Sequence, residues 1–581
     1  MPTVNVPRDL LFERLNRKFT EEEFDHLCFQ FGVELDEVSA DEKDPTITIY
    51  KIDIPANRYD LLCVEGISRA LSIFLGDIKP PIYKAIQPTS MVQTIVKPST
   101  QSVRPFIVTG ILRGVRVTKN IYNSIIDLQE KLHHNICRKR TFVAIGVHDL
   151  SKLTPPFTYS ADPPTSITFK PLNQTKEFRA DELMEFYQSD NHLKHYLHII
   201  KDSPVYPIIR DSTGTVLSMP PIINGDWTKV DLEGKPEKIM DLFFEATATD
   251  ITKANIVLDT LITMLSEHSA SKFEAEATEV FYEHSGETVL LPSLTTRTQL
   301  IDVKETNSVV GVNLKAEEMS TSLTRMGLKS SVKNKGSISV DIPPTRHDVI
   351  HVCDIVEDVA IAYGYDNIVA ELPRTPTVAR QFPLNKVTDL LRENVAQSGF
   401  TEALTFSLCS VEDECEKIRQ KRIEVEPTLA KISNPKTLEF QTCRKTLIPG
   451  LLKTIQANKK MPLPLKLFEI SDVVLVDEKE EVGARNERHL AAVAYNKLPG
   501  FEIIHGLLDR IMALLEVGEG NYWLEACDGN PTFFEGRGAL IKVKGKEGAI
   551  GSLGVLHPEV CEKFELINPC SALEINLERI L

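Results

Sequence analysis

The chain has no long apolar stretch: no segment approaches the roughly 18 consecutive apolar residues that a membrane-spanning helix needs. Its first eight residues, Met1 to Arg8, lack both a basic start and an apolar run, so no secretion signal is expected. The ten cysteines are scattered without a CxxC pair, which argues against structural zinc and disulfides and suits a reducing compartment. We therefore expect a cytoplasmic protein that does not enter a membrane.

An excess of positive charge is also lacking, because the formal net charge is −16. Contacts to nucleic-acid phosphates come from local basic patches, so this total neither supports nor excludes an RNA partner. The densest basic stretch is Arg138-Lys139-Arg140, for which a solvated surface turn is the simplest interpretation. With 581 residues, the chain is too long for one hydrophobic core, and about three to five domains are expected.

Local patterns predict several elements. Thr20 and Glu23 have capping-box spacing, and Gly32 is suited to end the helix that follows. The Pro-rich stretch 79–98 predicts a linker. Near the C-terminal third, a helix is predicted from Phe382 to Gly399, and its apolar face is formed by Leu384, Val387, Leu390, Leu391 and Val395.

An internal repeat is visible without reference to any other protein. The segment 53–60 (DIPANRYD) resembles 341–348 (DIPPTRHD), and the match continues at Val64 and Val352 and at Ile67 and Ile355. Both copies follow an alternating, strand-like segment and precede a helical pattern. The repeat predicts two copies of one strand–turn–helix unit.

The second copy carries carboxylates that the first copy lacks. Asp348 is suited to be the N-cap of a helix that runs to about Tyr363, and Asp354, Glu357 and Asp358 fall at i, i+3 and i+4 on one face. A hard cation such as Mg²⁺ would offset their mutual repulsion; the alternative is a solvated acidic face that binds nothing. The equivalent positions in the first copy are Gly66, Arg69 and Ala70.

The second copy, together with the residues that follow it to Asp366, resembles the metal-binding module of phenylalanyl-tRNA synthetase beta subunits. The resemblance implies Mg²⁺ ligands at Asp348, Asp354, Glu357 and Asp358. Further stretches resemble the family's N-terminal module, its central editing domain and its C-terminal catalytic-like domain: 55–60; 217–225; and 434–438, 447–452, 467–472 and 551–559.

The resemblance implies a multidomain α+β fold, in which mixed α/β modules precede a class II synthetase-like antiparallel sheet flanked by helices. The expected domains are an N-terminal module at 1–85, a tRNA-editing-type domain at 86–270, a metal-binding module at 295–375 and a degenerate class II catalytic-like domain at 380–581. Because the chain stops at Leu581, the anticodon-binding domain of bacterial relatives is not expected, and the eukaryotic cytosolic type is favoured.

The family's activity is the ATP- and Mg²⁺-dependent attachment of phenylalanine to its tRNA, in a heterotetramer of two alpha and two beta chains. We expect the aminoacylation site in the alpha subunit, because residues 533–539 match the Gly-rich third motif of class II enzymes poorly. A competing interpretation is that Arg444 and Arg537 still bind ATP, as arginines clamp transferred phosphates in that class.

The resemblance also implies that the central domain hydrolyses mischarged tyrosyl-tRNA. A hydrophobic pocket rejects an added hydroxyl by only roughly a hundredfold, so a second site is needed that recognises the hydroxyl. Candidates for this pocket are His148, Asn224, Glu245, Thr247 and Asp250.

Two other functions remain open from the sequence. The chain could be a tRNA-binding assembly scaffold that has lost editing, or a free-standing aminoacyl-tRNA deacylase that works without an alpha subunit. Deacylation of mischarged tRNA and the size of the native complex distinguish them.

Overall fold

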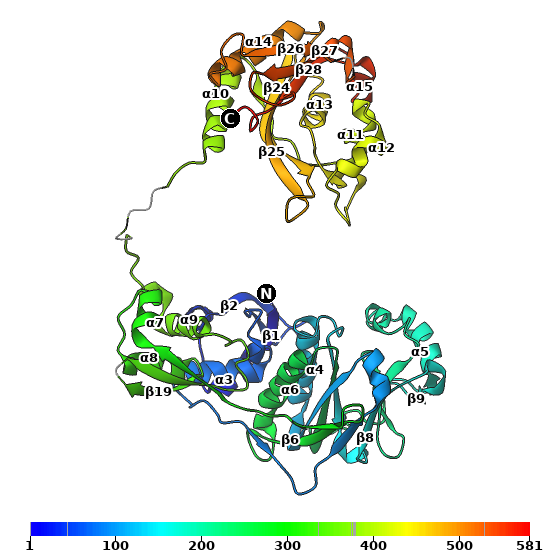
Figure 1. Ribbon diagram of the computed structural model, residues 1–581. Helices are drawn as coiled ribbons and strands as arrows, with labels where there is room; N and C mark the ends of the chain where they lie inside the picture. Colours follow the sequence, from blue (N-terminus) through cyan, green and yellow to red (C-terminus); the bar gives the residue numbers. More distant parts are fainter. Residues whose placement is uncertain (1, 43, 335, 373–374, 376–378, 528) are drawn as a thin grey trace. The chain divides into compact units, whose positions relative to one another are not determined.

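The chain divides into two units, Met1–Leu372 and Pro373–Leu581, which are coloured from blue to green and from green to red in Figure 1. The computed structural model describes residues 2–42, 44–334, 336–372, 375, 379–527 and 529–581. Within these ranges no helix combines the length and the apolar character that crossing a bilayer requires. All ten cysteines carry free thiols.

The first unit begins with a module built on a three-stranded sheet. Thr20 and Glu23 form the predicted capping box, and Gly32 ends the helix in a left-handed conformation, so both predictions are confirmed. The strands have the order β1-β3-β2. The elements are β1 (Thr3–Pro7), α1 (Arg8–Leu15), α2 (Glu21–Phe31), β2 (Glu34–Ala40), β3 (Thr48–Asp53) and α3 (Val64–Phe74).

A second module in the first unit has the same order of elements and the same sheet topology. Its strands have the order β18-β20-β19, and its last helix begins at Val352, 352 − 64 = 288 residues after Val64. The predicted strand–turn–helix repeat is therefore confirmed and extends over six elements. These are β18 (Arg297–Asp302), α7 (Val303–Val310), α8 (Ala316–Arg325), β19 (Lys329–Asn334), β20 (Ser337–Ile342) and α9 (Val352–Tyr363).

The two modules pack on each other reciprocally. Helix α2 lies against α9 and α8 against α3, and in the repeat α2 corresponds to α8 and α3 to α9. Ile361 of α9 lies 3.5 Å from the point where a Cβ on Gly32 would stand. Arg325 of α8 donates from Nε to the carbonyl oxygen of Phe74 at 3.0 Å. The modules thus approximate a two-fold arrangement within one chain.

Between the modules, in sequence, lie two large sheets, besides the short antiparallel pair β9 (Thr168–Phe169) and β10 (Phe178–Arg179). One has the order β4-β15-β6-β14-β7 and the other the order β13-β12-β11-β8-β5-β16-β17. The strands are β4 (Lys84–Ile86), β5 (Gln93–Val96), β6 (Phe106–Thr118), β7 (Val143–Asp149), β8 (Phe157–Asp162), β11 (Tyr206–Arg210), β12 (Val216–Met219), β13 (Ile223–Asn224), β14 (Glu237–Ala248), β15 (Glu274–Glu276), β16 (Thr278–Tyr282) and β17 (Glu287–Leu291).

The prediction of a linker at 79–98 is wrong, because this stretch supplies two strands. β4 pairs in parallel with β15, and β5 lies between β8 and β16, parallel to both. The prolines at positions 80, 81 and 98 flank the strands and leave their backbone N–H groups available for pairing.

Helices cover one face of the five-stranded sheet, and the seven-stranded sheet meets the other. Helices α4 (Lys119–His134) and α6 (Ile251–Leu265) pack on β6 and on each other (Figure 1). A Cβ on Gly110 of β6 would stand 2.4 Å from Ile262 of α6, so Gly110 and its partner Phe244 face the helices. Since side chains alternate along a strand, Glu245 faces the opposite sheet.

The second unit is built on a seven-stranded sheet of order β21-β24-β25-β29-β28-β27-β26, antiparallel except between β21 and β24. Helices α10 (Pro383–Gln397) and α14 (Phe501–Leu514) pack on one face, and α13 (Ile448–Ala457) and α15 (Pro558–Lys563) on the other. The strands are β21 (Thr401–Glu402), β24 (Leu465–Val476), β25 (Ala484–Tyr495), β26 (Tyr522–Ala526), β27 (Phe533–Val543), β28 (Gly551–Leu556) and β29 (Cys570–Asn576).

Helix α10 occupies the predicted stretch, but its apolar face is narrower than expected. Leu391 and Val395 are buried in the core, whereas Leu390 is 55% exposed. Leu390 lies one position, about 100° of helical rotation, before Leu391, so the core covers only one of the two.

Candidate functional site

The pairing of β7 with β14 brings two of the predicted site residues together. Glu245 lies opposite Gly146, and His148 lies opposite Phe243, two residues along each strand. Paired residues of an antiparallel ladder project to the same face. His148 Nε2 consequently lies 3.7 Å from Glu245 Oε1, at the interface of the two sheets.

Gly146 makes room for this pair. A Cβ at this position would stand 2.2 Å from Glu245 Oε1 and 2.8 Å from His148 Nε2. Any side chain would therefore displace one of the two groups. Glycine at this strand position permits the carboxylate and the imidazole to approach each other across the ladder.

The two groups are held by hydroxyls, one from the second sheet and one from the segment between β13 and β14. Ser218 Oγ of β12 donates to Glu245 Oε1 at 2.7 Å, and Thr228 Oγ1 lies 2.8 Å from His148 Nδ1. Both His148 and Glu245 are almost fully buried. These contacts fix the orientation of the carboxylate and of the ring.

One polar atom of each group has no hydrogen-bond partner among the described residues: Glu245 Oε2 and His148 Nε2. Leaving a buried polar group unpaired costs about 1–3 kcal/mol. Two such atoms on neighbouring side chains, beside the ring of Phe243, suit a ligand that presents one hydroxyl on an apolar group. The hydroxyl could donate to the carboxylate and accept from the imidazole.

The other predicted pocket residues lie at different distances from this pair. Asn224 lies opposite Ser218 in the β12–β13 ladder and so projects to the same face. The Thr247 hydroxyl accepts a hydrogen bond from Arg104 Nε at 3.3 Å. Asp250 is the N-cap of α6 and pairs with Lys253, so the structure does not bring it to the pair.

The sequence-based prediction missed Gly146, Ser218 and Thr228. Ser218 lies inside the stretch 217–225 that resembles the editing domain, so its neighbourhood was indicated although its role was not. Thr228 and Gly146 give no local signal, because their contacts with His148 and Glu245 depend on how the strands pair and how the two sheets pack.

The four carboxylates of the second module are arranged differently from the prediction. Helix α9 begins at Val352 and its N-cap is His351, so the prediction of Asp348 as N-cap is wrong. The carboxylate of Asp348 is instead held by Arg346, whose Nε and Nη2 donate to it at 2.9 and 2.7 Å. Asp354 completes a capping box by accepting the His351 N–H at 2.7 Å. The predicted end at Gly364 is confirmed.

Arg346 supplies the positive charge that the prediction assigned to a metal. Its Nη2 also donates to Asp358 Oδ2 at 2.7 Å, and all three side chains of this network are nearly buried. Glu357 is exposed. Across the described ranges, no three His, Cys, Asp or Glu side chains come together as a metal ion would require. As arranged, the four residues do not fit a resident Mg²⁺, and metal binding there remains a prediction.

In the second unit, Arg444 is not free to contact a nucleotide. It is buried, and its Nη1 donates to Glu469 Oε1 at 2.8 Å and to Thr405 Oγ1 at 2.9 Å. Arg537 is exposed on β27, at an irregularity of its pairing with β28. The geometry gives no support to a joint phosphate clamp by these two arginines.

Comparison with known proteins first defines the class. Three family models match: the phenylalanyl tRNA synthetase beta chain CLM domain at residues 368–577, the Phe-tRNA synthetase beta subunit B1 domain at 1–77 and the tRNA synthetase B5 domain at 300–365. All three are parts of aminoacyl-tRNA synthetases, the ligases that charge tRNA.

Full-length relatives then define the family. The phenylalanine–tRNA ligase beta subunit of Homo sapiens is 54% identical over 597 residues, covering 99% of each chain. Those of Mus musculus and Saccharomyces cerevisiae are 55% and 42% identical over 100% of each chain. An N-terminal fragment of the phenylalanyl-tRNA synthetase beta subunit from Pyrococcus horikoshii is 30% identical, with a TM-score of 0.56, over 63% of this chain and 100% of the fragment. The chain belongs to the phenylalanine–tRNA ligase beta subunits.

Proposed function

We propose that this beta subunit hydrolyses mischarged tyrosyl-tRNA at the site formed by Glu245 and His148. The observation that carries the proposal is the pair of buried, unpartnered atoms Glu245 Oε2 and His148 Nε2. The tyrosine hydroxyl satisfies both, whereas phenylalanine leaves both unpaired. Sites that hydrogen-bond a hydroxyl reject the analogue without it far more strongly than apolar pockets reject an added hydroxyl.

Hydrolysis of purified tyrosyl-tRNA by the complex of this chain with its alpha partner tests the proposal. We expect Glu245→Ala to slow hydrolysis at least tenfold, since one hydrogen bond to a charged group contributes about 1.5–3 kcal/mol. Asn224→Ala tests the neighbouring amide in the same assay. The matched control is Glu237→Ala, at the exposed end of the same strand, where the carboxylate pairs with Arg116 and with no other cation among the described residues.

Charging with phenylalanine reports whether each variant is folded and assembled. If Glu245→Ala hydrolyses tyrosyl-tRNA as the wild type does, the site assignment is wrong. If the wild type does not hydrolyse it either, the chain is a scaffold without editing. Activity of the isolated chain equal to that of the complex would indicate a free-standing deacylase.

We infer that aminoacylation takes place on an alpha partner, in a heterotetramer of two alpha and two beta chains that uses ATP and Mg²⁺ and acts on the tRNA for phenylalanine. The locking of Arg444 by Glu469 supports this, because an arginine held in a buried ion pair cannot also clamp a phosphate. The antiparallel sheet with helices on both faces is compatible with a degenerate class II domain. A cytoplasmic location is supported by the Arabidopsis thaliana relative, which is named as cytoplasmic.

ATP-dependent charging with labelled phenylalanine by each chain alone and by the pair tests the division of labour. We expect activity only in the pair. Charging by this chain alone would show that its C-terminal unit is a working catalytic domain.

A further inference from the structure

The basic stretch at the end of α4 has an unusual backbone. Arg138, Lys139 and Arg140 have φ values of 47°, 51° and 65°, so three consecutive residues with side chains adopt the left-handed conformation. This conformation crowds the Cβ and is normally taken by glycine or asparagine, one residue at a time. Such conformations persist only where surrounding contacts enforce them, and they gather at functional sites.

The buried side chain of Arg104 holds this turn in its conformation through hydrogen bonds to the backbone. Its side chain is 1% exposed, and among the described residues it forms no ion pair with a carboxylate. Its guanidinium instead donates to the carbonyls of Arg140 at 3.3 Å, Thr141 at 3.0 Å and Phe142 at 3.4 Å. It also donates to the carbonyl of Thr247 at 2.8 Å. A buried arginine thus fastens the turn to the strand that carries Glu245.

Arg140 fastens the turn on its other side. Its guanidinium lies 4.1 Å from the ring centre of Tyr196 and donates to the carbonyls of Pro221 at 3.2 Å and Ile222 at 2.9 Å. Ile222 is two residues before Asn224. The turn is therefore joined to both sheets, close to the residues that form the Glu245–His148 site.

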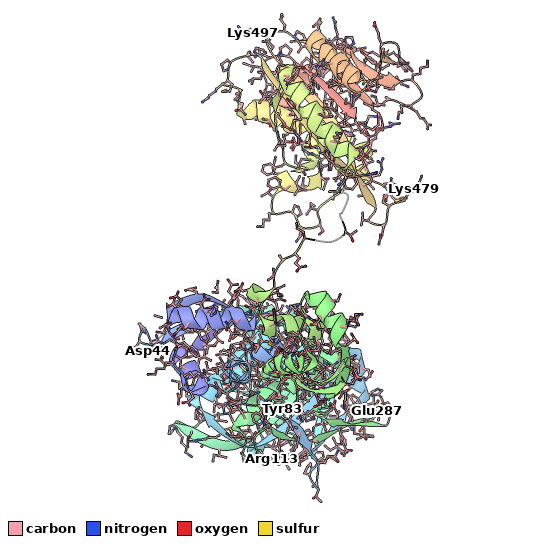
Figure 2. All side chains as sticks on the ribbon, turned by 90° about the vertical axis from the view of Figure 1, so that its left-hand side faces the viewer. Asp44, Tyr83, Arg113, Glu287, Lys479 and Lys497 are labelled. Carbon is pink, nitrogen blue, oxygen red and sulfur yellow. The ribbon has the colours of Figure 1, made fainter. Side chains whose placement is uncertain are left out.

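The two remaining cations of the turn project outward. Arg138 and Lys139 are exposed, and neither forms an ion pair within the described part of the chain, while Arg138 lies 5.1 Å from the ring centre of Phe142. Other exposed arginines of the same region are neutralised. Arg113, at the lower edge of Figure 2, pairs with Glu276 and Asp241, and Arg179 pairs with Asp181.

We propose that this turn is a phosphate-binding element for the tRNA strand whose aminoacylated 3′ end enters the Glu245–His148 site. Arg138 and Lys139 contact the phosphates, and Arg104 and Arg140 are positioning residues that hold the turn beside the site. The inference rests on the proposed editing function. The inference also explains the left-handed conformation of the turn, which directs the side chains of Arg138 and Lys139 outward from a rigid backbone. The chain as a whole has a net charge of −16, so these two cations provide a local positive charge next to the site where the tRNA polyanion binds.

The test compares Arg138→Gln/Lys139→Gln with Arg116→Gln/Lys119→Gln, each in the complex with the alpha partner. The control removes the same charge from two exposed residues, Arg116 near the end of β6 and Lys119 at the start of α4, whose 16 residues span roughly 24 Å. Hydrolysis is measured with tyrosyl-tRNA and with tyrosyl-adenosine, an ester that lacks the RNA phosphates, at several salt concentrations.

For Arg138→Gln/Lys139→Gln we expect KM for tyrosyl-tRNA to rise roughly tenfold and the salt dependence of log(kcat/KM) to lose roughly 1 to 2 units of slope. Hydrolysis of tyrosyl-adenosine should be unchanged, and the control should resemble the wild type with both esters. Unchanged KM and slope for tyrosyl-tRNA overturn the proposal, and so does an equal loss with both esters, which indicates a structural role. If the wild type hydrolyses neither ester, the editing function itself fails, and the proposal that rests on it fails as well.

Discussion

The two copies of the repeat share one fold but use the equivalent face of their last helix in opposite ways. In the first copy, Glu65 and Arg69 of α3 are buried against the C-terminal end of α6 and the residues that follow it. The equivalent residues of α9, at an offset of 288, are Cys353 and Glu357, and both are exposed. The two copies therefore share the same fold, but this face of the last helix is buried in an internal contact in the first copy and is exposed to solvent in the second.

The internal contact of the first copy centres on Arg69. Its guanidinium donates to the carbonyls of Thr263 and Met264 at 3.2 and 3.0 Å and to Glu267 at 2.6 Å. It also donates to the hydroxyl of Tyr83 at 2.9 Å, and Tyr83 is labelled in the first unit in Figure 2. Because the N–H groups of the Arg69 guanidinium all donate hydrogen bonds in a buried environment, Arg69 should contribute much more to the free energy of unfolding than Glu357, its counterpart in the second copy.

The largest effect is expected for Arg69→Met. Removing one partner of a buried, hydrogen-bonded ion pair costs about 3–5 kcal/mol. The counterpart Glu357→Gln should change stability by less than about 0.5 kcal/mol, as is usual for exposed residues. Hydrogen exchange of the α3 and α9 amides measures both. Equal effects of the two variants would contradict the contrast between the copies.

An effect of similar size is expected for Arg346→Met, in the turn of the second copy. The substitution removes the cation that donates hydrogen bonds to the buried carboxylates of Asp348 and Asp358, so we again expect a loss of about 3–5 kcal/mol. Arg58→Met should cost less, because Arg58 forms an ion pair with Asp60 and acts on Asp348 and Asp358 only through its charge, without a hydrogen bond among the described residues. Thermal unfolding of both variants provides the measurement, and a larger loss for Arg58→Met would show that the pairing of Arg346 with Asp348 and Asp358 is not what stabilises this turn.

A pH dependence should distinguish the two copies as well. Burial by itself would raise the pKa of Glu65, but hydrogen bonds from His268 and Ser124 and the charge of Arg14 lower it to about 2, from an ordinary value of 4.5. The folded state thus binds this proton more weakly than the unfolded chain, so the stabilisation is present above pH 4.5 and is lost as the pH falls toward 2. A shift of this size corresponds to roughly 3 kcal/mol.

Glu65→Gln should therefore be less stable than the wild type by on the order of 2–3 kcal/mol at pH 7, with the difference shrinking below pH 4. Cys353→Ser, at the equivalent position, should shift the melting temperature by a similar small amount at every pH. Melting temperatures between pH 3 and 7 give the profile. A constant difference for Glu65→Gln would mean that its carboxylate charge is not what stabilises the contact.

The smallest effect is expected from magnesium. Since Arg346 already donates hydrogen bonds to both Asp348 and Asp358, adding millimolar Mg²⁺ should leave the melting temperature of the first unit unchanged in the wild type. The same titration on Arg346→Met is the informative comparison, because there the carboxylates have lost their cation. Stabilisation of the wild type by several degrees would restore the predicted metal site.

The sequence was sufficient for features that depend on neighbours along the chain. The Thr20 capping box and the end of α9 at Gly364 follow from spacing within one or two turns, and the repeat follows from the similarity of two short segments. The prediction for Asp348 was wrong because it considered only the type and the position of the residue. Arg346, two residues earlier, donates hydrogen bonds to the carboxylate that would otherwise accept a backbone N–H of the helix. The side-chain alternation of β14 correctly placed Glu245 and Thr247 on one face.

Features that depend on packing between distant segments could not be predicted. Ser218 meets Glu245 because β12 and β14 belong to different sheets that stack, and no periodicity encodes that stacking. The strands β4 and β5 were hidden because each is short and lies in a proline-rich stretch. β5 pairs with β8, which is also distant along the chain, and the partners β15 and β16 follow well over a hundred residues later.

The most direct test of the editing function is ATP-dependent charging of tRNA with tyrosine by the complete alpha–beta complex. With the wild-type chain we expect no accumulation of tyrosyl-tRNA, because we propose that the site of Glu245 and His148 binds the tyrosine hydroxyl and hydrolyses the ester. With Glu245→Ala we expect tyrosyl-tRNA to accumulate while charging with phenylalanine proceeds unchanged. If neither complex accumulates tyrosyl-tRNA although both charge phenylalanine, or if both accumulate it equally, the assignment of editing to this site is contradicted.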